Sequence, residues 1–170
     1  MSDHLYQVVE IDGKGLGCIA TQDIKRGTVI LREHPQLAVS LPDYTLQVDS
    51  SPMSIIQIMT TFNGMKKDDQ TEYLKLSDSF LYSNLLPSEK KLEMQSYLEE
   101  SRTALISMGK TNDEAEKMLR VFGIYLTNCF HGGVCFKSAR FNHSCRHNAC
   151  DVGAYFSKVT GMYIFSIRVK

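Results

Sequence analysis

The chain has 170 residues, a length typical of one domain, with 19 basic and 19 acidic side chains and a sequence pI near 6.9. This balance excludes an overall electrostatic attraction, so we expect no direct nucleic-acid partner and no membrane partner. The apolar runs are far shorter than the roughly 20 residues that cross a bilayer, and five cysteines without a secretory signal predict a soluble nuclear or cytoplasmic protein.

The first 50 residues favour short β-strands. Apolar and β-branched stretches at residues 6–11, 17–20 and 28–32 are interrupted by glycines, as in a sheet of short strands joined by turns. From Ser51 the spacing of apolar residues changes to that of a helix, with Pro52 suited to its first turn. The apolar face of this first helix is predicted to contain Ile55, Ile56, Met59 and Phe62.

Two more helices are predicted before residue 128. One begins at Ser88 and ends at Gly109, which suits a left-handed C-terminal position. Its apolar residues are Leu92, Leu98, Leu105 and Ile106. The next begins with a capping box of Thr111 and Glu114. Its helically spaced apolar residues are Ala115, Met118, Leu119, Phe122 and Leu126.

The pattern returns to β after residue 132, with strands predicted at 134–136, 149–156 and 162–169. We therefore predict an α+β fold in which small sheets of short strands are interrupted by a helical insertion. The predicted organisation is a single domain over residues 1–170, with N-terminal strands in 1–50, a helical insertion in 51–128 and C-terminal strands in 129–170.

Two segments carry groups suited to ligand binding. Residues 13–17 read Gly-Lys-Gly-Leu-Gly directly after a predicted strand, and glycines let backbone atoms approach a ligand closely, although a simple β-turn has the same composition. Residues 140–149 read Arg-Phe-Asn-His-Ser-Cys-Arg-His-Asn-Ala, rich in hydrogen-bonding groups. A surface loop or a small zinc site are the alternatives for this second segment, because several His and Cys residues lie near it.

Together these segments resemble a known family. Residues 142–145, Asn-His-Ser-Cys, are similar to the signature of SET-domain protein-lysine methyltransferases, and residues 13–17 resemble the glycine-rich loop that opens that domain. Residues 17–33, GCIATQDIKRGTVILRE, look like its first strands. The helical insertion and residues 128–130, Asn-Cys-Phe, look most like the SMYD-type branch, although the zinc-binding MYND module of that branch has no counterpart here.

The resemblance implies a cofactor and its ligands. S-adenosylmethionine is expected to contact the backbone of Lys14, Gly15 and Leu16, with Asn128, Asn142 and His143 completing the pocket. In the family Asn142 would orient the amino-acid end of the cofactor, and His143 would contact the adenine through its main chain. Cys145 would be one ligand of a zinc ion shared with downstream cysteines, none of which follows Cys150.

The resemblance also implies the reaction, which is methyl transfer to a lysine of a histone or non-histone protein. The family's closing segment, an acidic turn and a strand with an aligning tyrosine, is expected beyond Lys170, so no catalytic residue is assigned. The chain by itself is therefore expected to have little activity, as a fragment or splice form would. The alternatives are a non-catalytic SET-like scaffold that binds cofactor or a protein partner, and a small zinc-binding adaptor.

Overall fold

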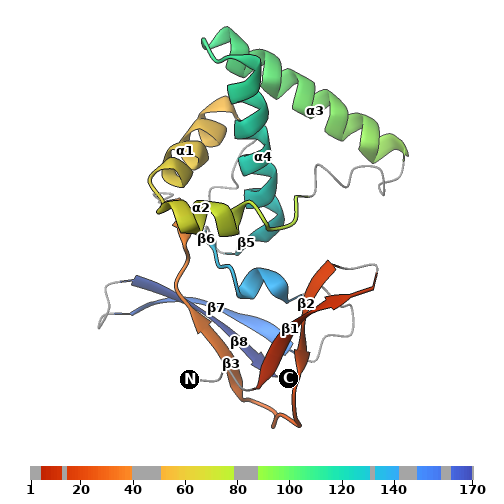
Figure 1. Ribbon diagram of the computed structural model, residues 1–170, viewed down its shortest axis with the longest axis vertical. Helices are drawn as coiled ribbons and strands as arrows, with labels where there is room; N and C mark the ends of the chain where they lie inside the picture. Colours follow the sequence, from red (N-terminus) through yellow and green to blue (C-terminus); the bar gives the residue numbers. More distant parts are fainter. Residues whose placement is uncertain are drawn as a thin grey trace. The chain divides into compact units, whose positions relative to one another are not determined.

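The structure is a computed structural model that describes residues 5–12, 15–39, 51–78, 88–130, 133–141, 149–157 and 162–169. The chain divides into two compact units. The discontinuous unit consists of Met1–Gln36 and Gly133–Lys170, and the helical unit is Leu37–Gly132. Helices and small antiparallel sheets occur together, which confirms the predicted α+β fold (Figure 1).

The discontinuous unit begins with an antiparallel hairpin of β1 (Tyr6–Ile11) and β2 (Gly15–Ala20). The register pairs Tyr6 with Ala20 at the open end and Ile11 with Gly15 at the turn. Gly15 has a φ of 66°, a left-handed conformation that favours glycine and that often ends a three-residue hairpin connection. Strand β2 begins at Gly15, two residues before the predicted start at residue 17.

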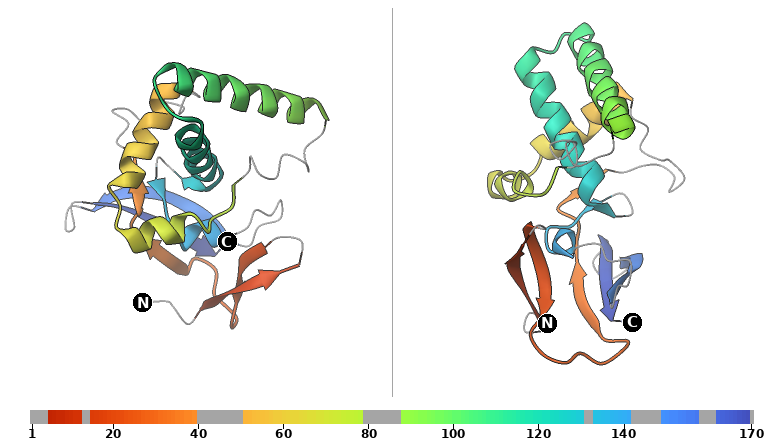
Figure 2. Two further views of the ribbon diagram at one scale, coloured as in Figure 1. Left: turned by 45° about the horizontal axis from the view of Figure 1, so that its top comes forward. Right: turned by 90° about the vertical axis from the view of Figure 1, so that its right-hand side faces the viewer.

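A three-stranded antiparallel sheet also belongs to this unit, in the order β3 (Val29–Glu33), β8 (Met162–Val169) and β7 (Ala149–Ser157). Its core contains the buried side chains of Ile30, Leu31 and Ile167. Figure 2 shows the hairpin, in red, and the blue C-terminal strands as separate layers of this unit. The two-residue β6 (Gly133–Val134) and the 3₁₀ turn η2 (Ser138–Arg140) come between β3 and β7 in this unit.

In its described residues, the helical unit contains four helices and two two-residue strands. The helices are α1 (Pro52–Asn63), α2 (Lys67–Tyr73), α3 (Ser88–Ser107) and α4 (Asn112–Asn128), and the strands are β4 (Leu37–Ala38) and β5 (Cys129–Phe130). Helix α4 is central, since it packs against α1 and α3 and has nine buried residues. None of the helices in the described ranges is long and apolar enough to cross a membrane.

The predicted helix ends are confirmed by the hydrogen bonds at their caps. Ser51 caps α1 through a 3.3 Å bond from the Ser54 amide, and Thr111 accepts a 3.2 Å bond from the Glu114 amide. The Glu114 carboxylate in turn accepts from the Thr111 amide at 2.8 Å, which completes the capping box. Gly109 follows α3 with a φ of 85°, as predicted.

The predicted apolar faces were partly wrong. Leu92 on α3 is 66% exposed and Leu126 on α4 is 40% exposed, whereas Val121, Ile124 and Tyr125 are buried. Figure 1 shows that the first part of α3 extends past α4, and Leu92, in the second turn of α3, lacks the support that Leu105 finds near the other end. Helix α4 is covered on more than one side, and a single helical stripe therefore underestimates its core.

Candidate functional site

The hairpin presents the backbone of the glycine-rich segment without obstruction. A Cβ atom built on Gly15 would meet no heavy atom within 4 Å, and the Leu16 side chain is 46% exposed. Space next to a backbone held in a left-handed conformation is what close approach of a ligand requires. Lys14, the third residue predicted in this segment, lies outside the described residues.

The residues just before the second predicted segment, 138–141, pack against the hairpin. Turn η2 packs against β2, and the Phe141 ring lies 5.3 Å from the Tyr6 ring, measured between centroids. Tyr6 is at the open end of the hairpin, about 17 Å along β2 from Gly15 at roughly 3.4 Å per residue. Asn142 and His143 follow Phe141 directly but lie outside the described residues, so their meeting with residues 13–17 stays a prediction.

A pocket of about 490 Å³ lies within the discontinuous unit, where the hairpin faces the three-stranded sheet. Its lining is mainly apolar and aromatic, and it includes Tyr6, Cys18, Ile24, Ile30, Phe141 and Val169. Burial raises the pKa of the Cys18 thiol to about 11, and the positive charge of Arg140 opposes that rise. The thiol is therefore neutral near pH 7 and suits contact with an apolar group better than nucleophilic chemistry.

Asn128 has a structural role that its hydrogen bonds define. The side chain is 4% exposed, and its Nδ2 donates to the backbone oxygens of Ser77 and Ile124, both at 2.7 Å. One bond satisfies a carbonyl in the last turn of α4, and the other joins the chain after α2 to that helix end. Both amide hydrogens are used inside the helical unit, so contact with a cofactor through this side chain would use Oδ1 as an acceptor.

Two buried tyrosines near the end of α4 were not predicted. The Tyr73 hydroxyl donates to the backbone oxygen of Val121 at 2.9 Å. The Tyr125 hydroxyl has no nitrogen or oxygen partner within the described part of the chain, and its neighbour is the Cys129 thiol, a weak hydrogen-bond acceptor. Burial raises the pKa of both hydroxyls, and the neighbouring Cys129 adds to each effect. Apolar spacing could have placed Tyr125 in the core, but Tyr73 lies in a short polar helix without such a signal.

The predicted metal ligand is not described. Cys145 lies outside the described residues, as do most of the His and Cys residues near it. In the ranges that the structure describes, no group of three or more His, Cys, Asp or Glu residues could hold a metal ion. In the same ranges, Cys18, Cys129 and Cys135 are thiols that are not joined in a disulfide.

A sequence model of the SET domain matches residues 15–169, which is most of the chain. The chain belongs to the SET-domain family. SET domains are, as a family, protein-lysine methyltransferase domains that use S-adenosylmethionine. The match includes Gly15, Leu16, Asn128, Asn142 and His143, while Lys14 lies one residue before it. No curated protein and no solved structure matches this SET-domain chain.

Proposed function

We propose that this SET-domain chain binds S-adenosylmethionine and takes part in methyl transfer to lysine side chains of proteins. We also propose that it belongs to the SMYD-type branch of the family. The observation that supports this most strongly is the SET match, because it contains residues 15–17 of the glycine-rich segment and the Asn-His-Ser-Cys segment in order. A nuclear or cytoplasmic location is part of the proposal, as is a histone or non-histone protein substrate.

The proposed cofactor residues are Lys14, Gly15, Leu16, Asn128, Asn142 and His143. The cofactor supplies a methyl group on a positively charged sulphonium. The open space at Gly15 and its left-handed backbone fit close approach of such a ligand. In Asn128, whose Nδ2 donates both of its hydrogens, Oδ1 is the atom that could accept a hydrogen bond from the cofactor. Zinc binding through Cys145 is a separate proposal that needs further cysteine ligands.

The reaction needs the target lysine in its neutral form. At a usual pKa near 10.4, deprotonation at pH 7 costs about 4.6 kcal/mol. An apolar channel and an adjacent positive charge both disfavour the ammonium form, so a dedicated base is not required. Positioning of the amine in line with the methyl group then supplies roughly 7 to 11 kcal/mol of the lowered barrier.

Calorimetry with S-adenosylhomocysteine tests the cofactor proposal. The variant is Gly15→Val, and the matched control is Gly109→Val, because both glycines have positive φ and open space at Cβ. The added Cβ strains the backbone similarly at both sites, so both variants should lose stability, but only Gly15→Val should lose affinity. Equal affinity in both variants, or no binding by the wild-type chain, would contradict the proposal.

Transfer of a labelled methyl group to histone and non-histone proteins then separates an enzyme from a scaffold. A chain that binds S-adenosylhomocysteine and transfers no methyl group, even when supplied with any further segment of its parent protein, fits the non-catalytic alternative. Stoichiometric zinc in the purified protein would support the zinc-binding adaptor instead.

A further inference from the structure

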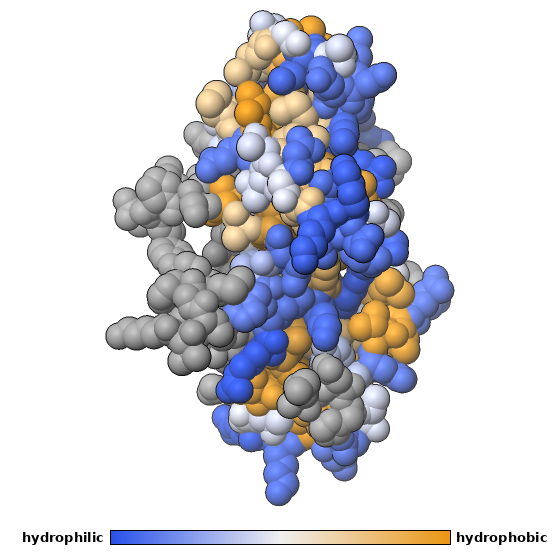
Figure 3. All heavy atoms as spheres, turned by 60° about the vertical axis from the view of Figure 1, so that its left-hand side comes forward, coloured by the Kyte–Doolittle hydropathy of each residue, from blue (hydrophilic) through white to orange (hydrophobic). Residues whose placement is uncertain are grey.

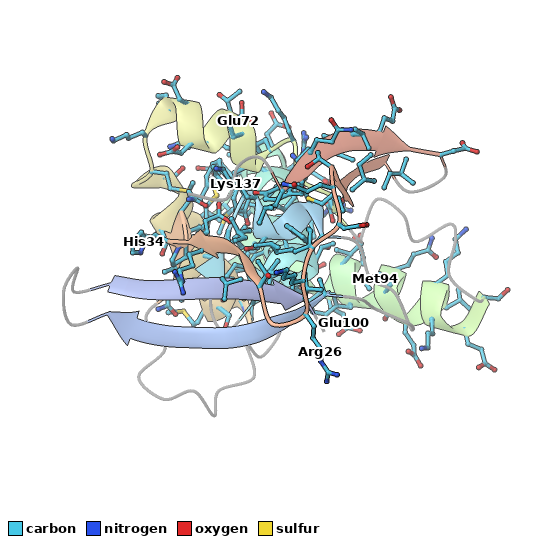
Figure 4. All side chains as sticks on the ribbon, turned by 90° about the horizontal axis from the view of Figure 1, so that it is seen from below. Arg26, His34, Glu72, Met94, Glu100 and Lys137 are labelled. Atoms are coloured by element: carbon cyan, nitrogen blue, oxygen red, sulfur yellow. The ribbon has the colours of Figure 1, made fainter. Side chains whose placement is uncertain are left out.

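The carboxylate of Glu33, the last residue of β3, holds the start of turn η2. One oxygen, Oε1, accepts a hydrogen bond from the Lys137 amide at 3.0 Å. The other, Oε2, accepts from the Ser138 amide at 2.9 Å and from the Ser138 hydroxyl at 3.2 Å. Three donors that are more than 100 residues away in sequence therefore converge on one carboxylate. Figure 4 shows Lys137 on the segment that begins η2, in the discontinuous unit.

Gln36 supports the same segment from the chain just after β3. Its Oε1 accepts from the Phe136 amide at 3.0 Å, and its backbone amide donates to the Val134 oxygen at 3.0 Å. Its Nε2 donates to the backbone oxygen of His34 at 2.8 Å, which fixes the side chain itself. Residues 134–138 are thus attached to the end of β3 at several points, and the bonds to the Glu33 carboxylate are the charge-assisted ones.

These bonds determine where the chain enters the Asn-His-Ser-Cys segment. After Ser138, the turn closes through hydrogen bonds from the amides of Ala139, Arg140 and Phe141 to the carbonyls of Cys135, Lys137 and Ser138, at 2.9 to 3.0 Å. Phe141 is then placed against Tyr6. Asn142 follows at the next position, so the backbone that leads into it has little freedom left.

We propose that Glu33 is a positioning residue for Asn142 and His143, and that it acts through the Lys137 and Ser138 amides. This inference rests on the proposed cofactor function. It requires a carboxylate, because two backbone amides and a hydroxyl all donate and an amide side chain would offer one acceptor and one opposing donor. Loss of these bonds lets η2 shift relative to β3. The backbone that leads into Asn142 is then held less well, and the affinity for the cofactor falls.

The test compares Glu33→Gln with the wild-type chain and with Glu93→Gln. Glu93 lies on an exposed part of α3, so the control removes the same charge without touching η2. Three measurements are made on each protein: the unfolding midpoint, the amide chemical shifts of Lys137 and Ser138, and the affinity for S-adenosylhomocysteine by calorimetry. We expect Glu33→Gln to change both amide shifts and to weaken binding about tenfold or more, since charge-assisted bonds are lost. Glu93→Gln should match the wild type in the last two measurements.

The outcomes separate positioning from a purely structural role. If Glu33 contributes only stability, Glu33→Gln lowers the midpoint while the folded protein binds with wild-type affinity, and the inference is overturned. If this variant does not fold, Ser138→Ala decides, because it removes only the 3.2 Å bond. A fall in affinity of a few fold supports the inference, and unchanged affinity overturns it. Failure of the wild-type chain to bind is a different result, which removes the proposed function and this inference with it.

Discussion

Tyr73 and Tyr125 offer a matched pair of substitutions with opposite expectations. Both side chains are 0% exposed in the helical unit. The Tyr73 hydroxyl donates to the Val121 oxygen at 2.9 Å, whereas the Tyr125 hydroxyl has only the weakly accepting Cys129 thiol as its neighbour in the described ranges. Tyr73→Phe loses this bond and should lower the free energy of unfolding by about 0.5 to 1.5 kcal/mol. Tyr125→Phe removes a buried hydroxyl that has no nitrogen or oxygen partner in the described ranges, and should leave stability unchanged or raise it by up to about 1 kcal/mol.

Urea unfolding followed by circular dichroism at 222 nm measures both effects. At roughly 2 to 4 °C per kcal/mol for a chain of this size, the two variants should also differ by several degrees in melting temperature. The slopes of the urea transitions should agree with that of the wild type, so that the midpoints report stability alone. A Tyr125→Phe variant that is destabilised as much as Tyr73→Phe would refute this reasoning, since its hydroxyl would then be making a bond as strong as that of Tyr73.

The same pair carries a prediction for alkaline pH. Burial, the larger cause, raises the pKa of both hydroxyls above the usual value of 10.0. The unfolded chain then releases these protons more readily than the folded chain, so stability is complete below about pH 10 and falls as the pH rises above it. Each Phe variant should lose less stability between pH 9 and 11 than the wild type, and equal losses would contradict the assignment.

Three further predictions concern local contacts. Thr111→Ala should cost about 1 kcal/mol in urea unfolding, with Thr111→Ser as a near-neutral control. Hydrogen bonds from Thr111 lower the pKa of the Glu114 carboxyl below its usual value of 4.5. Wild-type stability should therefore fall as the pH drops below about 4.5, and Thr111→Ala should reduce this dependence. Asn128→Asp should cost about 3 kcal/mol or more, because a buried carboxylate would face two carbonyl oxygens; a smaller loss than Asn128→Ala would contradict this. Iodoacetamide should modify Cys18 at pH 8 about 100-fold more slowly than an exposed thiol, by peptide mass spectrometry, and comparable rates would refute the raised pKa of about 11.

Local signals in the sequence predicted the features that depend on local chemistry. Ser51, Thr111 and Gly109 mark helix ends because their side chain or backbone geometry acts within a few residues, and all three predictions were confirmed. Strands β1, β7 and β8 also agree with the predicted ranges to within one residue. Helix α2 was missed because its seven residues are mostly polar and its only strongly apolar contact is through Tyr73.

Features that depend on distant contacts could not be read from the pattern. Glu33 is the last residue of the segment 17–33 that looks like the first strands of a SET domain. Nothing near it in sequence indicates that its carboxylate binds amides 104 and 105 residues away. One hydrogen-bond partner of Asn128 is also distant in sequence, since Ser77 is separated from it by 51 positions. The predicted site residues Gly15 and Leu16 lie on an accessible hairpin, while the cofactor contacts of all six residues stay predictions.

The interrupted course of the β-rich unit affects how the protein is made. Its first 36 residues leave the ribosome with the apolar edge of β3 unpaired, and the strand that covers Ile30 and Leu31 is separated from them by the whole helical unit of 96 residues. At about 5 to 20 residues per second, that delay lasts roughly 5 to 20 s or longer. The helical unit is continuous and rich in local contacts, so it has time to fold first, while β3 stays without its partner β8 and its edge is open to pairing with other chains.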